Sequence, residues 1–216
     1  MRLLDKIKFS SSDTMYVLGD FLDKGKHSIK LGKFISGAQN MVAICGNHEH
    51  YFIQYYQSLM RGLRDNDNID LVLKRLQEYF YAENEPISWD FMDFLESMPR
   101  IVSKSECILV HAGVELDKSG GVVDIKAQDP NTFIFTRKLA ESSAIVQYDK
   151  TILFGHTPCY YQNNTGHIIK TSRQNKSIDS AVLADFAKVQ LDTGVSFTGL
   201  LGCLRGDDMR EFYVKS

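Results

Sequence analysis

Short apolar runs of strand length recur along this chain, and each run ends in a cluster of small and polar residues. The clearest runs are Met15–Leu18, Met41–Ile44, Cys107–Val110 and Thr151–Phe154. Amphipathic stretches with helical spacing lie between them, over Phe52–Leu63, Asp70–Tyr81 and Ser88–Met98. Strands that alternate with helices are typical of an α/β fold, so this pattern predicts that class.

The last third of the chain has a different pattern. Gln190–Leu191, Thr198–Leu204 and Arg210–Val214 are strand-like, and Gly206-Asp207-Asp208 has the composition of a hairpin turn. The stretch Thr171–Lys188 is polar at first and then helix-like. We predict two sheets with helices outside them, the second sheet being more antiparallel.

Composition narrows the class of protein. A chain of 216 residues with 44% apolar and 24% charged residues fits one globular domain spanning 1–216. A net charge of −2 argues against a general nucleic-acid or anionic-membrane surface. No apolar run reaches the roughly 18 residues of a membrane span, and the first residues resemble no secretory signal. The four cysteines are scattered, which favours a reducing, cytoplasmic location.

Polar residues with metal-binding side chains follow four of the apolar runs. They are Asp20, Asn47, His111 and His156. The carboxyl ends of strands form the edge where α/β sheets bind ligands. A mixed set of oxygen and nitrogen donors suits manganese, iron or zinc better than calcium or magnesium. Each residue alone could be a structural hydrogen-bonding group, but the four together predict a shared metal site.

Four short motifs occur in a characteristic order along the chain. They are Gly19-Asp20-Phe21-Leu22-Asp23-Lys24-Gly25, Gly46-Asn47-His48-Glu49, His111-Ala112-Gly113 and Gly155-His156-Thr157-Pro158. From Leu3 to about Leu204 the chain resembles the calcineurin-like metallophosphoesterases. Among them it is most similar to the bacterial and phage phosphoprotein phosphatases and their diadenosine tetraphosphatase relatives. The resemblance implies a sandwich of two mixed β-sheets flanked by helices.

The resemblance also implies a metal-ligand set. Asp20 would bridge two metal ions, and Asn47, His111 and His156 would complete the coordination of the second. The expected cofactor is a divalent transition metal, manganese first, with iron or zinc as alternatives. The family's site holds two metals, and we expect that this chain binds only one of them strongly.

Catalytic and phosphate-binding roles are implied for four further positions. His48 would donate a proton to the leaving-group oxygen, and Asp23 would hold and polarise His48. Lys24 stands where the family has an arginine that grips phosphate, and Arg137 matches a second such arginine. Asn47 is implied in substrate binding as well.

Alternative interpretations of three of these residues stay open. His48 could serve only as a structural hydrogen-bonding group, and Arg137 could be an ordinary surface residue of a helix. Glu49 could hydrogen-bond a ligand or could simply be a carboxylate favoured at a helix N-terminus.

The family's first motif, Asp-x-His-Gly, has no counterpart here, because residues 1–7 resemble the helix that follows it. We therefore expect the first strand and two metal ligands to be missing, and the activity of this chain to be reduced. Either a mis-assigned gene start or a natural loss of this segment would explain the missing motif. An exposed sheet region left by the lost strand also favours a homodimer.

These observations predict a metal-dependent phosphoester hydrolase in which metal-activated hydroxide attacks phosphorus. The expected substrate is a phosphoserine or phosphothreonine protein, or a small phosphoester, with no nucleic-acid or membrane partner. Two alternatives remain. One is a dinucleoside polyphosphate hydrolase, and the other is a catalytically weakened phosphate-binding or partner-binding module on the same fold.

Overall fold

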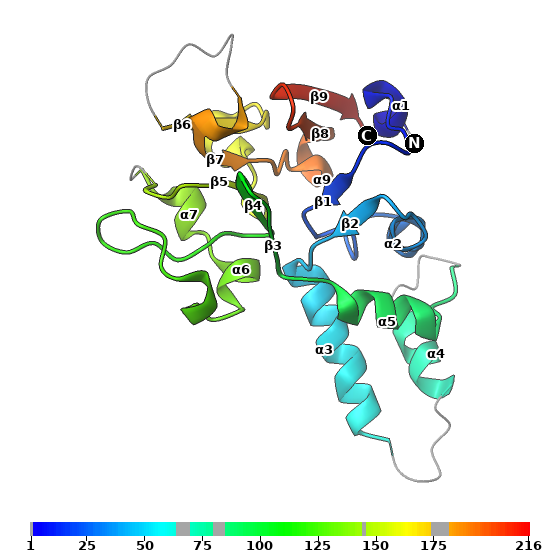
Figure 1. Cartoon of the computed structure of the whole chain (residues 1–216). Helices are drawn as coiled ribbons and strands as arrows, with labels where there is room; N and C mark the ends of the chain where they lie inside the picture. Colours follow the sequence, from blue (N-terminus) through cyan, green and yellow to red (C-terminus); the bar gives the residue numbers. More distant parts are fainter. Residues whose placement is uncertain (1, 64–69, 80–84, 144–145, 174–181) are drawn as a thin grey trace. The chain divides into compact units, whose positions relative to one another are not determined.

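The computed structural model describes residues 2–63, 70–79, 85–143, 146–173 and 182–216 (Figure 1). The chain divides into two compact units. Unit 1 comprises Met1–Asp13 and Arg100–Ser216, and unit 2 comprises Thr14–Pro99. That the whole of 1–216 acts as a single domain stays a prediction.

The described residues of unit 2 form a parallel pair of strands and four helices. Strand β1 (Met15–Val17) pairs with β2 (Met41–Ala43), and α2 (Ser28–Ser36) connects them. Parallel neighbours require such a crossover. Three further helices follow, α3 (Asn47–Arg61), α4 (Asp70–Tyr79) and α5 (Trp89–Ser97). The predicted strands and helices of this region are confirmed, with residues 80–81 outside the described part of the chain.

The helices of unit 2 share one apolar core. Each presents a helically spaced apolar face, and the core includes Ile29, Phe52, Leu76, Met92 and Leu95, all of them nearly fully buried. Burying one such side chain stabilises a fold by about 1.5–3 kcal/mol. Helix α5 begins where the sequence predicts, because the Ser88 hydroxyl accepts a hydrogen bond from the Phe91 amide at 3.3 Å.

Unit 1 is built around a five-stranded mixed sheet with the order β3-β4-β5-β7-β6. The strands are β3 (Ile101–Ser103), β4 (Cys107–Val110), β5 (Thr151–Phe154), β7 (Phe186–Gln190) and β6 (Ile169–Ser172). The three central strands run parallel and the two edge strands run antiparallel to them. Strands β4 and β7 are buried along their whole length, as is usual for parallel strands covered on both faces.

The remaining elements of unit 1 are short, apart from one hairpin. Strands β8 (Leu200–Arg205) and β9 (Arg210–Lys215) form this antiparallel hairpin, and residues 206–209 make its turn. The helices are α1 (Arg2–Ile7), η1 (Ile125–Ala127), α6 (Thr132–Phe135), α7 (Lys138–Glu141), α8 (Tyr160–Asn163), η3 (Leu183–Asp185) and α9 (Val195–Thr198). Helix α1 confirms the helix predicted for the start of the chain.

The prediction is wrong at the end of the stretch Thr171–Lys188. Residues 183–185 form one turn of 3₁₀ helix, and Phe186–Gln190 is strand β7 rather than helix. Alanine and lysine favour helix locally, but pairing with β5 on one side and β6 on the other overrides that preference. Residues 174–181 of this stretch lie outside the described residues.

A further correction concerns the start of β8. Thr198 ends helix α9, and Gly199 follows it with φ +66°, so the strand begins at Leu200 and not at Thr198. Glycine adopts this left-handed conformation without the steric cost that a side chain imposes.

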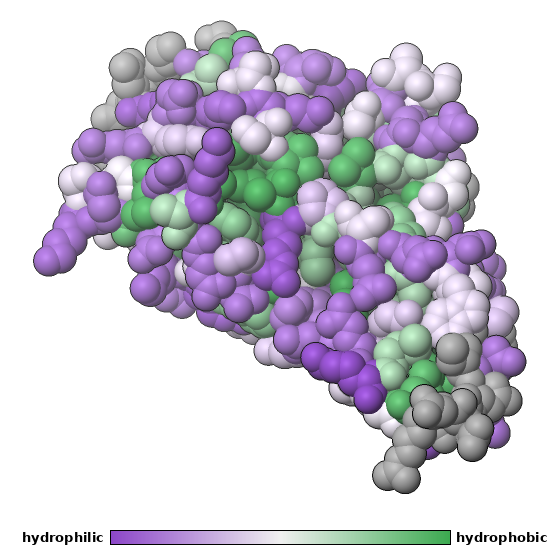
Figure 2. All heavy atoms as spheres, turned by 60° about the horizontal axis from the view of Figure 1, so that its bottom comes forward, coloured by the Kyte–Doolittle hydropathy of each residue, from purple (hydrophilic) through white to green (hydrophobic). Residues whose placement is uncertain are grey.

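The described helices include none that is both long enough and apolar enough to cross a lipid bilayer. On the face shown in Figure 2, hydrophilic residues predominate and apolar residues appear between them. A surface of this mixed kind is ordinary for folded proteins.

Candidate functional site

Several predicted site residues have a strained backbone. Asp20 and Asp23, in the loop after β1, have φ of +57° and +76°, and His156, in the loop after β5, has φ of +64°. A side chain in the left-handed region costs roughly 1 kcal/mol or more, and such residues concentrate at functional sites. Only three other described non-glycine residues have positive φ, namely Lys8, Asn164 and Met209.

The carboxylate of Glu49 holds the loop that carries Asp20. Glu49 lies in the first turn of α3 and is fully buried. It accepts hydrogen bonds from the main-chain amides of Asp20 at 2.8 Å, Leu22 at 2.9 Å and Gly46 at 3.0 Å. A helix N-terminus favours a carboxylate, and three amide donors offset the cost of burying it. Glu49 is thus a helix N-terminal carboxylate that also positions the backbone of a predicted metal ligand.

Gly46 allows the close approach of these groups. A Cβ atom at this position would lie 2.5 Å from Asp20 Oδ1, 2.7 Å from the Asp20 amide nitrogen and 2.8 Å from Glu49 Oε2. These distances are shorter than any ordinary van der Waals contact. The glycine of the Gly-Asn-His-Glu motif is therefore required by space, while its φ of −94° is ordinary.

His48 and Asp23 form a hydrogen-bonded pair. His48 Nδ1 lies 3.0 Å from Asp23 Oδ2, and His48 Nε2 lies 3.9 Å from Asp20 Oδ2. The His48 main-chain amide also donates to Asp20 Oδ1 at 3.4 Å. Because an ionised carboxylate can only accept, Nδ1 carries the proton of this hydrogen bond.

Lys24 and Asn47 complete the predicted residues of unit 2. Lys24 Nζ lies 3.5 Å from Asp20 Oδ2, with its side chain half-exposed. Asn47 is the first residue of α3 and is partly buried, directly before His48. Unit 2 therefore brings together all five of its predicted site residues at the ends of its two strands.

The two predicted histidine ligands of unit 1 lie side by side. His111 directly follows β4 and His156 follows β5, and these strands are parallel neighbours. His111 Nε2 lies 3.1 Å from His156 Nδ1, and His111 is almost fully buried. Two nitrogen ligands about 2.1 Å from one metal stand about 3 Å apart, so this pair fits one transition-metal ion. That these histidines and the residues of unit 2 serve one metal centre stays a prediction.

Arg137 belongs to the same region of unit 1. It precedes α7, and its Nη1 donates to Thr157 Oγ1 at 3.4 Å, one residue beyond His156. Arg137 is exposed and lines a pocket of about 530 Å³ together with Thr157 and Tyr161. Its side chain is thus directed toward the loop of a predicted ligand.

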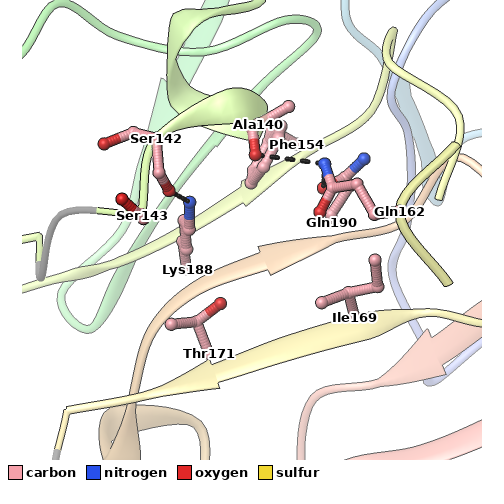
Figure 3. Close-up of a pocket in the computed structure, with 9 residues that line it drawn as sticks. All are labelled: Ala140, Ser142, Ser143, Phe154, Gln162, Ile169, Thr171, Lys188 and Gln190. Carbon is pink, nitrogen blue, oxygen red and sulfur yellow. Dashed lines mark hydrogen bonds between the residues drawn. The ribbon is translucent and has the colours of Figure 1, made fainter.

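Arg137 directly precedes helix α7. A buried lysine, which the sequence analysis did not single out, donates hydrogen bonds to main-chain carbonyl oxygens at this helix. Lys188 lies in β7, one of the three inner strands of the sheet, and its Nζ donates to the carbonyl oxygen of Leu139 at 2.7 Å. It also donates to the carbonyl oxygen of Ser142 at 2.8 Å (Figure 3). Burial lowers the pKa of Lys188. The sequence feature that could have revealed this role is Lys188 itself, a single cationic residue within the mainly apolar run of β7. Lys188 also lines a smaller pocket of about 190 Å³.

Comparisons with known proteins agree with this arrangement of motifs. The model of the calcineurin-like phosphoesterase family matches residues 1–193. Symmetrical bis(5'-nucleosyl)-tetraphosphatase from Delftia acidovorans is 32% identical over 120 residues, which are 52% of this chain and 39% of that protein. The asymmetrical bis(5'-nucleosyl)-tetraphosphatase PrpE from Bacillus subtilis is 29% identical over 111 residues, covering 47% of this chain and 43% of that protein. The chain thus matches about two fifths of the length of these relatives.

Two solved structures share the fold. A provisionally assigned diadenosine tetraphosphatase superposes with a TM-score of 0.67 over 99% of this chain and 86% of its own, at 14% identity. A metallophosphoesterase from Sphaerobacter thermophilus gives a TM-score of 0.52 over 100% of this chain and 82% of its own, also at 14% identity. The predicted α/β class with mixed sheets and helices is confirmed.

Proposed function

The chain belongs to the calcineurin-like phosphoesterase family, and we propose that it is a metal-dependent hydrolase of phosphoric esters and anhydrides with dinucleoside polyphosphates as substrates. The observation that carries the proposal is the Asp23–His48 pair, with 3.0 Å between its atoms, beside Asp20. A scaffold that only recognised phosphate would have no use for a histidine oriented in this way.

The proposed metal site draws on four residues. The family uses divalent metals, and the residues proposed to hold the ion are Asp20, Asn47, His111 and His156. When bound, a divalent metal neutralises phosphate charge and lowers the pKa of water toward about 7. Manganese is the first metal to test, because the donor set mixes oxygen and nitrogen.

His48 is proposed as the proton donor. Asp23 accepts from Nδ1, which orients the ring and stabilises its protonated form, so Nε2 can deliver a proton to the departing oxygen. A carboxylate in this position also keeps the same nitrogen protonated throughout. Proton donation of this kind typically contributes about 10²–10⁴-fold to a rate.

Phosphate binding is proposed for Lys24 and Arg137. Lys24 keeps the charge of the arginine that the family has at its position but lacks the planar two-point grip. Arg137 offers that grip from the loop before α7, beside Thr157. Asn47, at the N-terminus of α3, is proposed to contact the substrate as well.

The substrate class rests on the names of the relatives. Both matched relatives described above are bis(5'-nucleosyl)-tetraphosphatases, which favours a dinucleoside polyphosphate over a phosphoprotein. A phosphoserine or phosphothreonine protein is the second candidate, because the sequence also resembles the phage-type phosphoprotein phosphatases.

The test is hydrolysis measured with manganese present. The wild type, His48→Asn and the matched control His167→Asn would each be given p-nitrophenyl phosphate, diadenosine tetraphosphate and a phosphoserine peptide. His167 is exposed and belongs to unit 1, whereas His48 and Asp23 belong to unit 2. We expect turnover by the wild type and the control and its loss with EDTA, while His48→Asn should lose most of its activity with the phosphoserine peptide and less with p-nitrophenyl phosphate. Background rates for every protein would refute the proposal and favour a non-catalytic binding module.

A further inference from the structure

Three aromatic rings gather on the surface of unit 1, and we call them the aromatic platform. Tyr160 and Tyr161 belong to α8, and Phe197 belongs to α9. Their exposed fractions are 40%, 68% and 51%. Tyr161 stacks on Phe197 with 5.9 Å between ring centroids and 23° between planes, while Tyr160 meets Phe197 edge-on at 5.6 Å.

The platform is held by its backbone. Gly194 has φ +67°, and a Cβ atom there would lie 2.4 Å from Phe197 Cζ, so the ring lies directly over the glycine. The Thr198 hydroxyl hydrogen-bonds the carbonyl oxygens of Thr193 and Gly194 at 2.8 and 2.9 Å, which fixes the turn that carries Phe197. The Cys159 amide donates to the Asp192 carbonyl at 2.7 Å, so α8 is anchored to the same loop. The backbone segments that carry the three rings are therefore fixed relative to one another.

Tyr161 connects the platform to the pocket of about 530 Å³. Besides Tyr161, this pocket is lined by Arg137, Thr157, Glu141 and Gln162, together with Ala140, Ser142 and Ser143. Its volume is within the usual range for small-molecule sites. One wall is thus an aromatic ring backed by Phe197, and another wall carries a guanidinium group.

An aromatic face and a guanidinium in one pocket suit a ligand with a flat base and a phosphate. Base–aromatic stacking tolerates any nucleobase, because every base has a π-face. The guanidinium pairs with phosphate oxygens through two parallel hydrogen bonds. The Glu141 carboxylate repels a second phosphate but accepts hydrogen bonds from sugar hydroxyls or base amino groups. A phosphopeptide offers the phosphate without the base.

We propose that this pocket is a nucleoside subsite, in which the base stacks on Tyr161 and the adjoining phosphate contacts Arg137. Phe197 acts as a positioning residue that supports Tyr161 from behind. The inference rests on the proposed function and deepens it, because it selects a nucleotide substrate over a phosphoprotein.

The experiment compares a substrate that carries bases with one that lacks them. Diadenosine tetraphosphate and inorganic tripolyphosphate would be hydrolysed by the wild type, Tyr161→Ala, Tyr161→Phe and the matched control Phe34→Ala. Phe34 is an exposed ring on α2 that lines neither of the two pockets described above. Binding of ADP with manganese would be measured in parallel by calorimetry.

We expect Tyr161→Ala to raise KM for diadenosine tetraphosphate about tenfold, as loss of one stacked base implies. Its KM for tripolyphosphate stays within about twofold of the wild type, since that substrate has no base. Tyr161→Phe keeps the ring and restores the wild-type KM, and Phe34→Ala changes neither. ADP binding by Tyr161→Ala weakens by a similar factor.

Several outcomes overturn the inference. These are an unchanged KM for diadenosine tetraphosphate in Tyr161→Ala, an equal loss with tripolyphosphate, or no binding of ADP to the wild type. If no substrate is hydrolysed but Tyr161→Ala alone weakens ADP binding, the proposed function fails and the subsite stands.

Discussion

The buried carboxylate of Glu49 accepts a hydrogen bond from the main-chain amide of Asp20 at 2.8 Å, across 29 positions of the sequence. Asp20 has a left-handed backbone conformation, which costs free energy unless its surroundings enforce it. The same carboxylate binds the Leu22 amide at 2.9 Å, so it restrains both sides of Phe21. The fourth residue of the Gly-Asn-His-Glu motif therefore controls the shape of the loop that the first motif provides.

We predict that Glu49→Gln weakens both the fold and metal binding. The amide nitrogen of glutamine is a donor and faces main-chain N–H groups, so a buried donor is left unsatisfied at a cost of about 1–3 kcal/mol. Urea denaturation and manganese titration would measure the two effects. Asp93→Asn, on the exposed face of α5, is the matched control and should change neither quantity. A Glu49→Gln protein with wild-type stability and metal affinity would contradict the prediction.

Gly46→Ala tests the close approach beside Asp20. The new methyl group would lie 2.5 Å from Asp20 Oδ1, so the loop must move, and we expect a loss of about 1–3 kcal/mol in the free energy of unfolding. The matched control is Gly206→Ala in the β8–β9 turn, where a Cβ atom has no neighbour within 4 Å. Equal stability of the two variants in thermal denaturation would show that the space around Gly46 is not limiting.

The proton-donor role of His48 predicts a dependence on the leaving group. His48→Asn should slow hydrolysis of a phosphoserine ester by about 10²–10⁴-fold, because its leaving alkoxide oxygen needs a proton. Loss with p-nitrophenyl phosphate should be smaller, since p-nitrophenolate leaves without one. Asp23→Asn keeps a residue type that tolerates positive φ, and it should show the same pattern more weakly. Steady-state kcat values for both substrates decide the matter. An equal loss with both substrates would instead assign His48 to phosphate binding or metal positioning.

The sequence predicted best where local pattern and final environment agree. The runs Cys107–Val110 and Thr151–Phe154 are strands with the predicted bounds, and the histidines that follow them do lie together. Their register explains this, because parallel neighbours place their carboxyl ends at one edge. The pairing of His48 with Asp23, implied by the family resemblance, is also present.

Long-range contacts account for what could not be predicted. The sequence could not decide whether Glu49 hydrogen-bonds a ligand or is a helix N-terminal carboxylate. Its hydrogen-bond partners, the amides of residues 20 and 22, are close to it only in the folded loop. The signal was present, since a glutamate three residues after the first capping position is typical of a helix start. Strand β7 was missed because its alanine and lysine favour helix, whereas its burial depends on neighbours on both sides. The stacking of Tyr161 on Phe197 joins two short helices that no periodicity connects.

The pKa of Cys159 predicts how stability changes in alkaline solution. Cys159 is fully buried, and burial raises the pKa of its thiol from 9.0 to about 12. The unfolded chain therefore loses this proton at lower pH than the folded chain, so stability falls as pH rises from about 9 toward 12. The part due to Cys159 is about 1 kcal/mol between about pH 8 and about pH 10.

Cys159→Ser isolates this contribution. Serine does not ionise in this range and keeps a donor for the Gln190 carbonyl oxygen, which the thiol contacts at 3.2 Å. Urea denaturation with a reductant present would give the free energy of unfolding of both proteins at each pH. The pKa of Lys188 is lowered by burial, so Lys188 adds stability as pH rises, but it does so in both proteins and cancels in the difference. The difference between wild type and variant should therefore shrink by about 1 kcal/mol from about pH 8 to about pH 10. A difference independent of pH would mean that the Cys159 thiol is accessible to solvent in the folded protein.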